Sequence, residues 1–147
     1  MMMASDGAQL AYRMIIENET PDFSSDEPSY RNSFLYRQSI ELGAECQRLV
    51  QQFPVEERFN LVDQILRASV LVSSNIAGAN ESDTRKRRLR HFDIARGKLK
   101  RLETLLVVAK RVGYVEHQAL SRTKVLSNEI DALLKTLIKQ LDSQSWD

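Results

Sequence analysis

From about residue 33 onward, hydrophobic residues recur at the three- and four-residue spacings that place them on one face of an α-helix. The first row predicts a helix from about Ser33 to Phe53, and it consists of Leu35, Leu42, Cys46, Leu49 and Phe53. Pro54 ends this helix, because the residue before a proline is pushed out of the α-helical region. With no strand-type alternation along the chain, the pattern predicts an all-α fold.

A second helix is predicted from about Val55 to Ala79, with Glu56 and Glu57 suiting the positive end of its dipole. One face carries the row Leu61, Ile65, Ala68 and Val72. Other faces carry Val62, Leu66, Val70 and Leu71. A helix that is hydrophobic nearly all round is buried nearly all round. We therefore expect this helix to contribute to a subunit interface as well as to the core.

The third helix is predicted from about Thr84 to Val112, after a turn in which Gly78 or Asn80 can adopt positive φ and Ser82 or Asp83 can cap the next helix. Its core stripe is Phe92, Ala95, Leu99, Leu102, Leu106 and Ala109. A smaller apolar strip beside that stripe points to a partner, and it consists of Ile94, Leu105 and Val108.

Gly113 is a natural helix C-cap, and it predicts a fourth helix from about Glu116 to Leu141. The hydrophobic row of this helix is Ala119, Thr123, Leu126, Ile130, Leu133, Leu137 and Leu141. Short connections between helices of similar length make consecutive helices antiparallel. We expect residues 33–142 to form an antiparallel up-down-up-down four-helix bundle, followed by a flexible C-terminus at residues 143–147.

Residues 1–32 have a different composition, and we expect an acidic extension with a short helix near residues 8–17 and a linker at 18–32. Residues 1–30 hold one Arg against six Asp and Glu, a net charge of −5 that leaves +6 for the rest of the chain. Two alternatives are open for this extension: it docks onto the bundle or a neighbouring subunit, or it is a disordered tail.

The length and composition of the chain indicate a single domain, because 147 residues with 42 % hydrophobic content suit one core. A single cysteine, Cys46, rules out an internal disulfide and is expected as a small core residue. We find no signal peptide and no apolar run that would span a bilayer, so a soluble, cytoplasmic protein is expected.

Two motifs resemble a bacterial family, the four-helix bundle proteins encoded in intervening sequences of 23S ribosomal RNA genes. The first motif matches at Leu61, Gln64, Ile65, Arg67, Ala68, Ser69, Ser74, Asn75, Ile76 and Ala77. The second matches at Phe92, Ile94, Ala95, Gly97, Leu99, Glu103, Thr104, Leu105, Ala109, Gly113 and Tyr114. The chain departs from the family pattern at Gly78, where Glu-Gly is usual, and at Ser73 and Lys98.

The family is also similar to the accessory variability proteins of diversity-generating retroelements, which form pentameric rings and bind a reverse transcriptase and nucleic acid. The residues that resemble this group are the run Arg85–Arg88 together with Phe53, Pro54, Arg58 and Phe59. The resemblance implies a ring-forming scaffold associated with nucleic acid, with a reverse transcriptase or a ribosomal RNA-related partner.

Candidate catalytic chemistry is sparse. His91 and His117 are 26 residues apart without a carboxylate at metal-ligand spacing, so we expect neither a metal nor a cofactor. Glu103 is expected to pair with Lys100 or Arg96 in its own helix. For the cluster Ser73–Asn75, we favour side chains bonded to helix carbonyls over a ligand site. A non-enzymatic protein is predicted.

The third helix carries the strongest functional signal, with eleven Lys and Arg between residues 85 and 111. Cations at a helix N-terminus oppose the helix dipole, so we interpret the first five as ligands for an anion. The predicted nucleic-acid contacts are Arg85, Lys86, Arg87, Arg88, Arg90, Lys98, Arg101 and Arg111.

The predicted oligomer contacts are Val62, Leu66, Val70, Asn75, Ile94, Leu105 and Val108. The alternative is a protein-interaction scaffold whose basic face docks an acidic partner or the chain's own extension.

Overall fold

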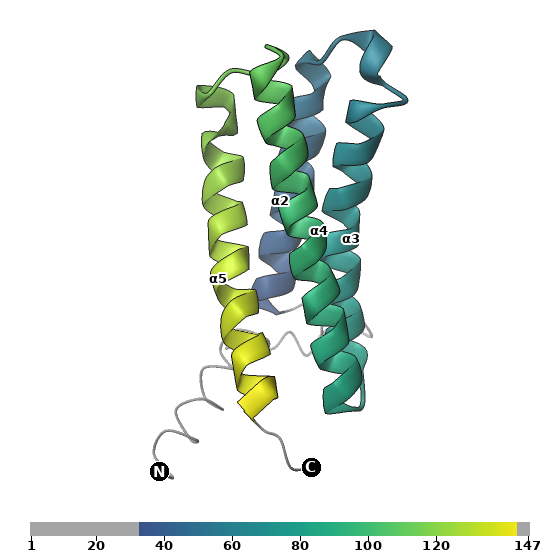
Figure 1. Cartoon of the computed structure of the whole chain (residues 1–147), viewed down its shortest axis with the longest axis vertical. Helices are drawn as coiled ribbons and strands as arrows, with labels where there is room; N and C mark the ends of the chain where they lie inside the picture. The colour runs from purple at the N-terminus through teal and green to yellow at the C-terminus, as the bar shows by residue number, and fades with distance from the viewer. Residues whose placement is uncertain (1–32, 144–147) are drawn as a thin grey trace, which may run out of the picture.

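The computed structural model describes residues 33–143, which form four long α-helices (Figure 1). They are α2 (Phe34–Leu49), α3 (Leu61–Glu81), α4 (Arg85–Arg111) and α5 (Ser121–Ser143). Three short 3-10 turns lie between them, at Val50–Gln52, Val55–Glu57 and Gln118–Leu120. The helix predicted at residues 8–17, the linker at 18–32 and the last four residues lie outside the described part of the chain.

Each helix packs mainly against two others, in the order α2–α3–α4–α5 and back to α2. Consecutive helices run in opposite directions, so the N-terminal ends of α2 and α4 lie at the same end of the bundle as the C-terminal ends of α3 and α5 (Figure 1). The all-α four-helix bundle predicted from the spacing of hydrophobic residues is therefore confirmed.

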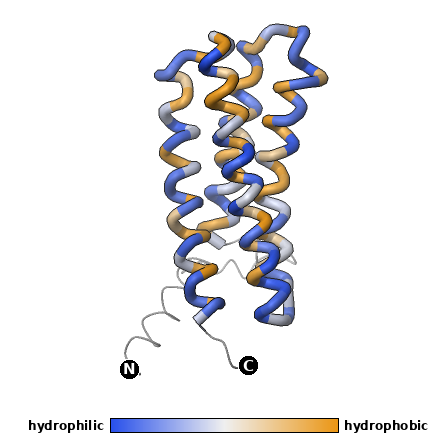
Figure 2. Tube along the Cα trace, viewed as in Figure 1, coloured by the Kyte–Doolittle hydropathy of each residue, from blue (hydrophilic) through white to orange (hydrophobic). Residues whose placement is uncertain are grey.

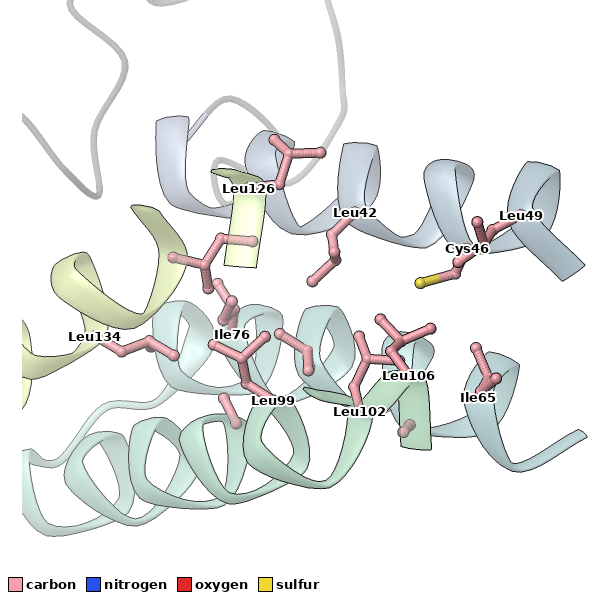
Figure 3. Packing of buried hydrophobic residues seen from close by; sticks show 14 of the residues in the cluster. Leu42, Cys46, Leu49, Ile65, Ile76, Leu99, Leu102, Leu106, Leu126 and Leu134 are labelled. Atoms are coloured by element: carbon pink, nitrogen blue, oxygen red, sulfur yellow. The ribbon is translucent and has the colours of Figure 1, made fainter. Parts of the chain in front are cut away.

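Most residues of the predicted rows belong to one hydrophobic core. Hydrophobic and polar positions alternate every few residues along each helix (Figure 2). Leucines of α2, α4 and α5 meet Cys46 and the isoleucines of α3 in the core (Figure 3). Every residue of the predicted α2 row and of the predicted α4 stripe is buried. In α5 the row shifts, because Leu134 is fully buried, Leu133 is only half-buried and Ala119 is exposed.

Two helices begin later than predicted. Residues 55–57 form a 3-10 turn, and α3 starts only at Leu61, where the Glu57 carboxylate accepts a hydrogen bond from the Leu61 amide at 3.2 Å. This carboxylate satisfies one of the free N–H groups at the helix start. Likewise Gln118–Leu120 is a 3-10 turn, so α5 starts at Ser121 and not at Glu116.

The connection between α3 and α4 also differs from the prediction. Gly78 lies inside α3, which continues to Glu81, and neither Gly78 nor Asn80 has positive φ. Thr84 caps α4, with its hydroxyl accepting a hydrogen bond from the Arg87 amide at 3.2 Å, in place of the predicted Ser82 or Asp83.

The end of α4 follows the prediction. Gly113 adopts φ +85°, and the Tyr114 amide donates to the Ala109 carbonyl at 2.9 Å. This hydrogen bond, together with the left-handed glycine, is the Schellman arrangement that terminates many helices. It directs Tyr114 toward the α2–α3 connection, where its hydroxyl donates to Glu57 Oε1 at 3.1 Å and its ring lies 5.8 Å from that of Phe53.

Candidate nucleic-acid interface

Five cations crowd the first two turns of α4, at the end of the bundle where α2 also begins and where α3 and α5 terminate (Figure 1). They are Arg85, Lys86, Arg87, Arg88 and Arg90. Figure 2 shows the α3–α4 hairpin as predominantly hydrophilic at this end. The helix forms in spite of this run because Thr84 caps its N-terminus, Phe92 is buried in the core and Leu89 packs against the core.

Two of the five cations bind the ends of neighbouring helices. Arg85 donates to the carbonyl of Leu141 in the last turn of α5, and Arg88 Nη2 donates to the carbonyl of Ser82 at 2.9 Å, just beyond α3. Carbonyls at helix C-termini lack partners within their own helix and carry partial negative charge. Arg85 and Arg88 therefore also stabilise the bundle. Their contact with an external anion stays a prediction.

The other three cations are exposed to solvent. Arg87 reaches Asp83 at 3.5 Å, a long contact between two exposed side chains. Lys86 and Arg90 make no hydrogen bond or ion pair with any other residue of the described segment 33–143. At 100° per residue they lie on the outward face of α4, one turn apart, with Asp93 as the nearest acidic residue on that face.

A second basic group lies at the middle of the α3–α4 groove. Lys98 and Arg101 from α4 join Arg67 from α3 around a shallow pocket of about 280 Å³. Arg101 Nη2 donates to Gln64 Oε1 at 3.2 Å, and Arg67 pairs with Asp63 at 3.3 Å. Arg111 is exposed at the far end of α4. The eight predicted contacts are thus spread along the whole helix, with their highest density at its start.

The α4 cations that face α5 are neutralised within the bundle. Arg96 Nε donates to Asp131 at 3.1 Å, and Lys135 and Lys100 approach the same carboxylate at 3.2 and 3.6 Å. Burial of Asp131 opposes ionisation, but these three cations outweigh it and hold the pKa of its carboxyl below the usual range. The expected partner of Glu103 is confirmed as Lys100, at 3.1 Å, whereas Arg96 is taken by Asp131.

The seven predicted oligomer contacts differ in their exposure to solvent. Val62, Leu66 and Leu105 are half-buried against the core of their own chain. Asn75 and Ile94 are also half-buried, whereas Val70 and Val108 are 58 % and 45 % exposed. The exposed hydrophobic area on the outer side of α3 and α4 is therefore narrower than the sequence pattern suggested.

The polar cluster in α3 is bonded to its own helix. Ser73 Oγ donates toward the carbonyls of Ser69 and Val70 at 3.4 and 3.3 Å, and Asn75 Nδ2 donates to the Leu71 carbonyl at 2.8 Å. The structural interpretation of Ser73–Asn75 is thus confirmed. Sequence reasoning missed the partner of the Asn75 oxygen, which lies 3.2 Å from Nδ1 of His91 in α4.

Within residues 33–143, no group of three or more His, Cys, Asp or Glu side chains is placed to hold a metal ion. The same described helices include none with both the length and the hydrophobicity needed to cross a bilayer.

Comparison with known proteins agrees with the motifs. The model of the 23S rRNA-intervening sequence protein family matches residues 31–136, well over half of the chain. A solved structure of a protein of unknown function, from the S23 ribosomal protein family of Bacteroides thetaiotaomicron VPI-5482, is similar with a TM-score of 0.66 and 24 % identity. The similarity covers 71 % of this chain and 95 % of that one, and at this identity it shows a shared fold. No curated protein is significantly similar. The family match, the bundle and the two motifs together show that the chain belongs to the 23S rRNA-intervening sequence protein family.

Proposed function

We propose that the chain is a non-enzymatic, homo-oligomeric scaffold that binds the phosphate backbone of RNA or DNA through the exposed cations of α4. The observation that supports this most directly is the pair Lys86 and Arg90, which face solvent without a carboxylate partner in the described residues. Arg87 lies beside them with only the long contact to Asp83.

The charge balance of the bundle supports the same proposal. Residues 33–143 hold 19 Lys and Arg against 13 Asp and Glu, and 11 of the 19 cations belong to α4. Cations without local partners raise the positive potential of one surface and attract polyanions. Contacts of Lys and Arg with phosphates give affinity that is independent of sequence and sensitive to salt. An association with ribosomal RNA genes in the family is in keeping with such a ligand.

Oligomerisation would multiply this charge. Val70 and Val108 are exposed on the outer side of α3 and α4. A Cβ atom at Gly97 would meet no described residue within 4 Å, apart from its chain neighbours and the nearby backbone of α4. A neighbouring copy seated there would bury the valines and could approach the α4 backbone closely at Gly97. We propose a ring, a pentamer by the retroelement resemblance, which would align five copies of the α4 cations. A reverse transcriptase as a further partner rests on that resemblance alone.

Light scattering of the full chain at micromolar concentration tests the oligomer. A mass several times 16.9 kDa is expected, and a monomer would refute the ring. In the oligomer, Val70→Asp with Val108→Asp should give monomers. Val107→Asp with Val125→Asp is the matched control, because these two valines are each 65 % exposed outside the proposed contact.

Filter binding at low salt tests the nucleic-acid function. We compare the wild-type chain with Lys86→Ser/Arg90→Ser and with Lys124→Ser/Lys139→Ser, a control that removes two exposed cations from α5. The proposal predicts binding of RNA or DNA of unrelated sequences and at least about a tenfold loss for the α4 variant only. Equal affinities for all three chains would instead favour the alternative, an acidic protein partner for the basic face.

A further inference from the structure

We infer that the chain's own acidic segment, residues 14–30, docks on the exposed cations at the start of α4 and competes there with external polyanions. The segment contains five acidic residues and neither Lys nor Arg, which gives it a net charge of −5. The acidic residues are Glu17, Glu19, Asp22, Asp26 and Glu27. Its charge is therefore complementary to that of the bundle's basic end.

The topology brings the two charges to the same end of the molecule. The segment joins the bundle at Ser33, whose hydroxyl caps α2 by accepting a hydrogen bond from the Tyr36 amide at 3.1 Å. Asn80 Nδ2 in the last turn of α3 donates to the same hydroxyl at 3.3 Å. Two residues beyond Asn80, the Ser82 carbonyl accepts from Arg88 of α4. The chain therefore enters the bundle next to the first two turns of α4.

The chain length between the acidic residues and this point is sufficient. From Glu27 to Ser33 there are six residues, which span up to about 20 Å when extended. The cation-bearing stretch from Lys86 to Arg90 rises only about 6 Å along the helix axis. Acidic side chains on residues 17–27 can thus reach Lys86, Arg87 and Arg90 without any rearrangement of the helices.

The other described acidic groups at this end leave room for a further anion. Asp93 lies on the same face of α4 as Lys86 and Arg90, Glu81 and Asp83 flank the α3–α4 turn, and Asp142 lies in the last turn of α5. Only Asp83 contacts one of the three exposed cations, at 3.5 Å. Docking of residues 14–30 would neutralise the remaining positive charge, and a phosphate backbone with denser charge would displace the segment. This arrangement makes the first 32 residues a built-in competitor for the basic surface.

Zero-length carbodiimide cross-linking of the full chain, without nucleic acid, tests the docking. At low salt we expect amide bonds between Lys86 and the carboxyl groups of residues 17–27, at least about fivefold more abundant than bonds from Lys124 to the same residues. Lys124 is the control because it is exposed near the start of α5, at the opposite end of the bundle. Mixing isotope-labelled with unlabelled chains shows whether each bond lies within one chain, as docking on the chain's own bundle requires. Equal yields at Lys86 and Lys124, or bonds that join different chains, would overturn the inference.

RNA binding gives an independent second readout. Neutralising the five acidic residues in the full chain, as E17Q/E19Q/D22N/D26N/E27Q, should strengthen RNA binding at low salt about tenfold, because the competitor is removed. If the wild-type chain binds RNA and the variant binds it with the same affinity, the acidic segment does not compete with RNA. If the proposed nucleic-acid function fails, neither chain binds RNA while the Lys86 cross-link persists, so the two failures are distinguishable.

Discussion

The imidazole ring of His91 lies directly against Gly78 on the facing helix. A Cβ atom at residue 78 would be only 2.9 Å from two atoms of that ring, which is closer than real contacts allow. The ring is held in place by Asn75, whose side-chain oxygen lies 3.2 Å from Nδ1 of His91. Glycine near the C-terminal end of α3 is thus explained by the close approach of α4 and not by a turn.

This relationship predicts an unusual response to Gly78→Ala. Alanine in a helix interior is more favourable than glycine by about 1 kcal/mol, but here the methyl group displaces His91 and breaks its contact with Asn75. We expect no gain in the free energy of unfolding in the wild-type background. In the His91→Ala background the gain of about 1 kcal/mol should appear. Equal stabilisation in both backgrounds, measured by urea unfolding, would show that the ring does not constrain residue 78.

Arg85 and Lys86 are adjacent, but replacing each by Ser should have different effects. Arg85→Ser should mainly lower stability, and Lys86→Ser should mainly lower RNA affinity. Arg85 donates to the Leu141 carbonyl, so Arg85→Ser should lower the free energy of unfolding by about 1 kcal/mol. Lys86 has no partner in the described residues, so Lys86→Ser should stay within about 0.5 kcal/mol of the wild type. RNA affinity should fall more for Lys86→Ser. Equal destabilisation by both changes would contradict the division of the basic run into structural and free cations.

Asp131→Asn should lower the free energy of unfolding at pH 7 by about 2 kcal/mol, because it removes the charged partner of Arg96, Lys135 and Lys100. Asp63→Asn, which breaks the exposed i,i+4 pair with Arg67, is the control and should cost less than about 0.5 kcal/mol. Similar losses for both variants would show that the Asp131 cluster is no stronger than a surface pair.

The same carboxyl should make stability depend on pH. Its pKa in the folded chain lies below its unfolded value because the hydrogen bonds from Arg96 and Lys135 outweigh the effect of burial. Its contribution is therefore complete above the unfolded pKa of about 4 and is lost as the pH falls through the folded pKa. The stability difference between wild type and Asp131→Asn should be constant from pH 7 to 5 and should shrink below pH 4. A difference that grows on acidification would contradict this sign.

The Cys46 thiol should be inert in the folded protein. It is completely buried, and burial raises its pKa to about 12, so the reactive thiolate is scarce at neutral pH. Iodoacetamide at pH 8 should modify Cys46 only at the rate of unfolding, and modification should become rapid in 6 M urea. Rapid modification of the native chain would show that α2 opens locally.

Much of the fold was predictable, because the hydrophobic residues whose spacing predicts each helix are the same residues that fill the core. The rows Leu35–Leu49 in α2 and Phe92–Ala109 in α4 are buried as predicted, and Gly113 takes the positive φ expected of a C-cap. The start of α3 was predicted too early, because acidic residues such as Glu56 and Glu57 are as favourable in a 3-10 turn as in the first turn of an α-helix. Local sequence does not show that the Glu57 carboxylate reaches Leu61 and Tyr114.

The candidate site was less predictable than the fold. The basic run is visible in the sequence. What distinguishes Arg85 and Arg88 from Lys86 and Arg90 is a contact with the Leu141 carbonyl, 56 residues along the chain, and one with the Ser82 carbonyl in the α3–α4 turn. Likewise the match between Gly78 and His91 arises only when α3 and α4 pack together. Contacts between helices decide which cations remain free, and spacing along one helix does not contain that information.

The salt dependence of RNA binding tests the proposed function most directly. The logarithm of the association constant of wild-type chain for a single-stranded RNA should fall linearly with the logarithm of salt concentration. In Lys86→Ser/Arg90→Ser the slope should be smaller by about 1.5 per bound chain, because two phosphate contacts are lost. The control Lys124→Ser/Lys139→Ser should keep the wild-type slope. A slope that is the same in all three chains, or a wild-type affinity that does not change with salt, would contradict phosphate binding by the start of α4.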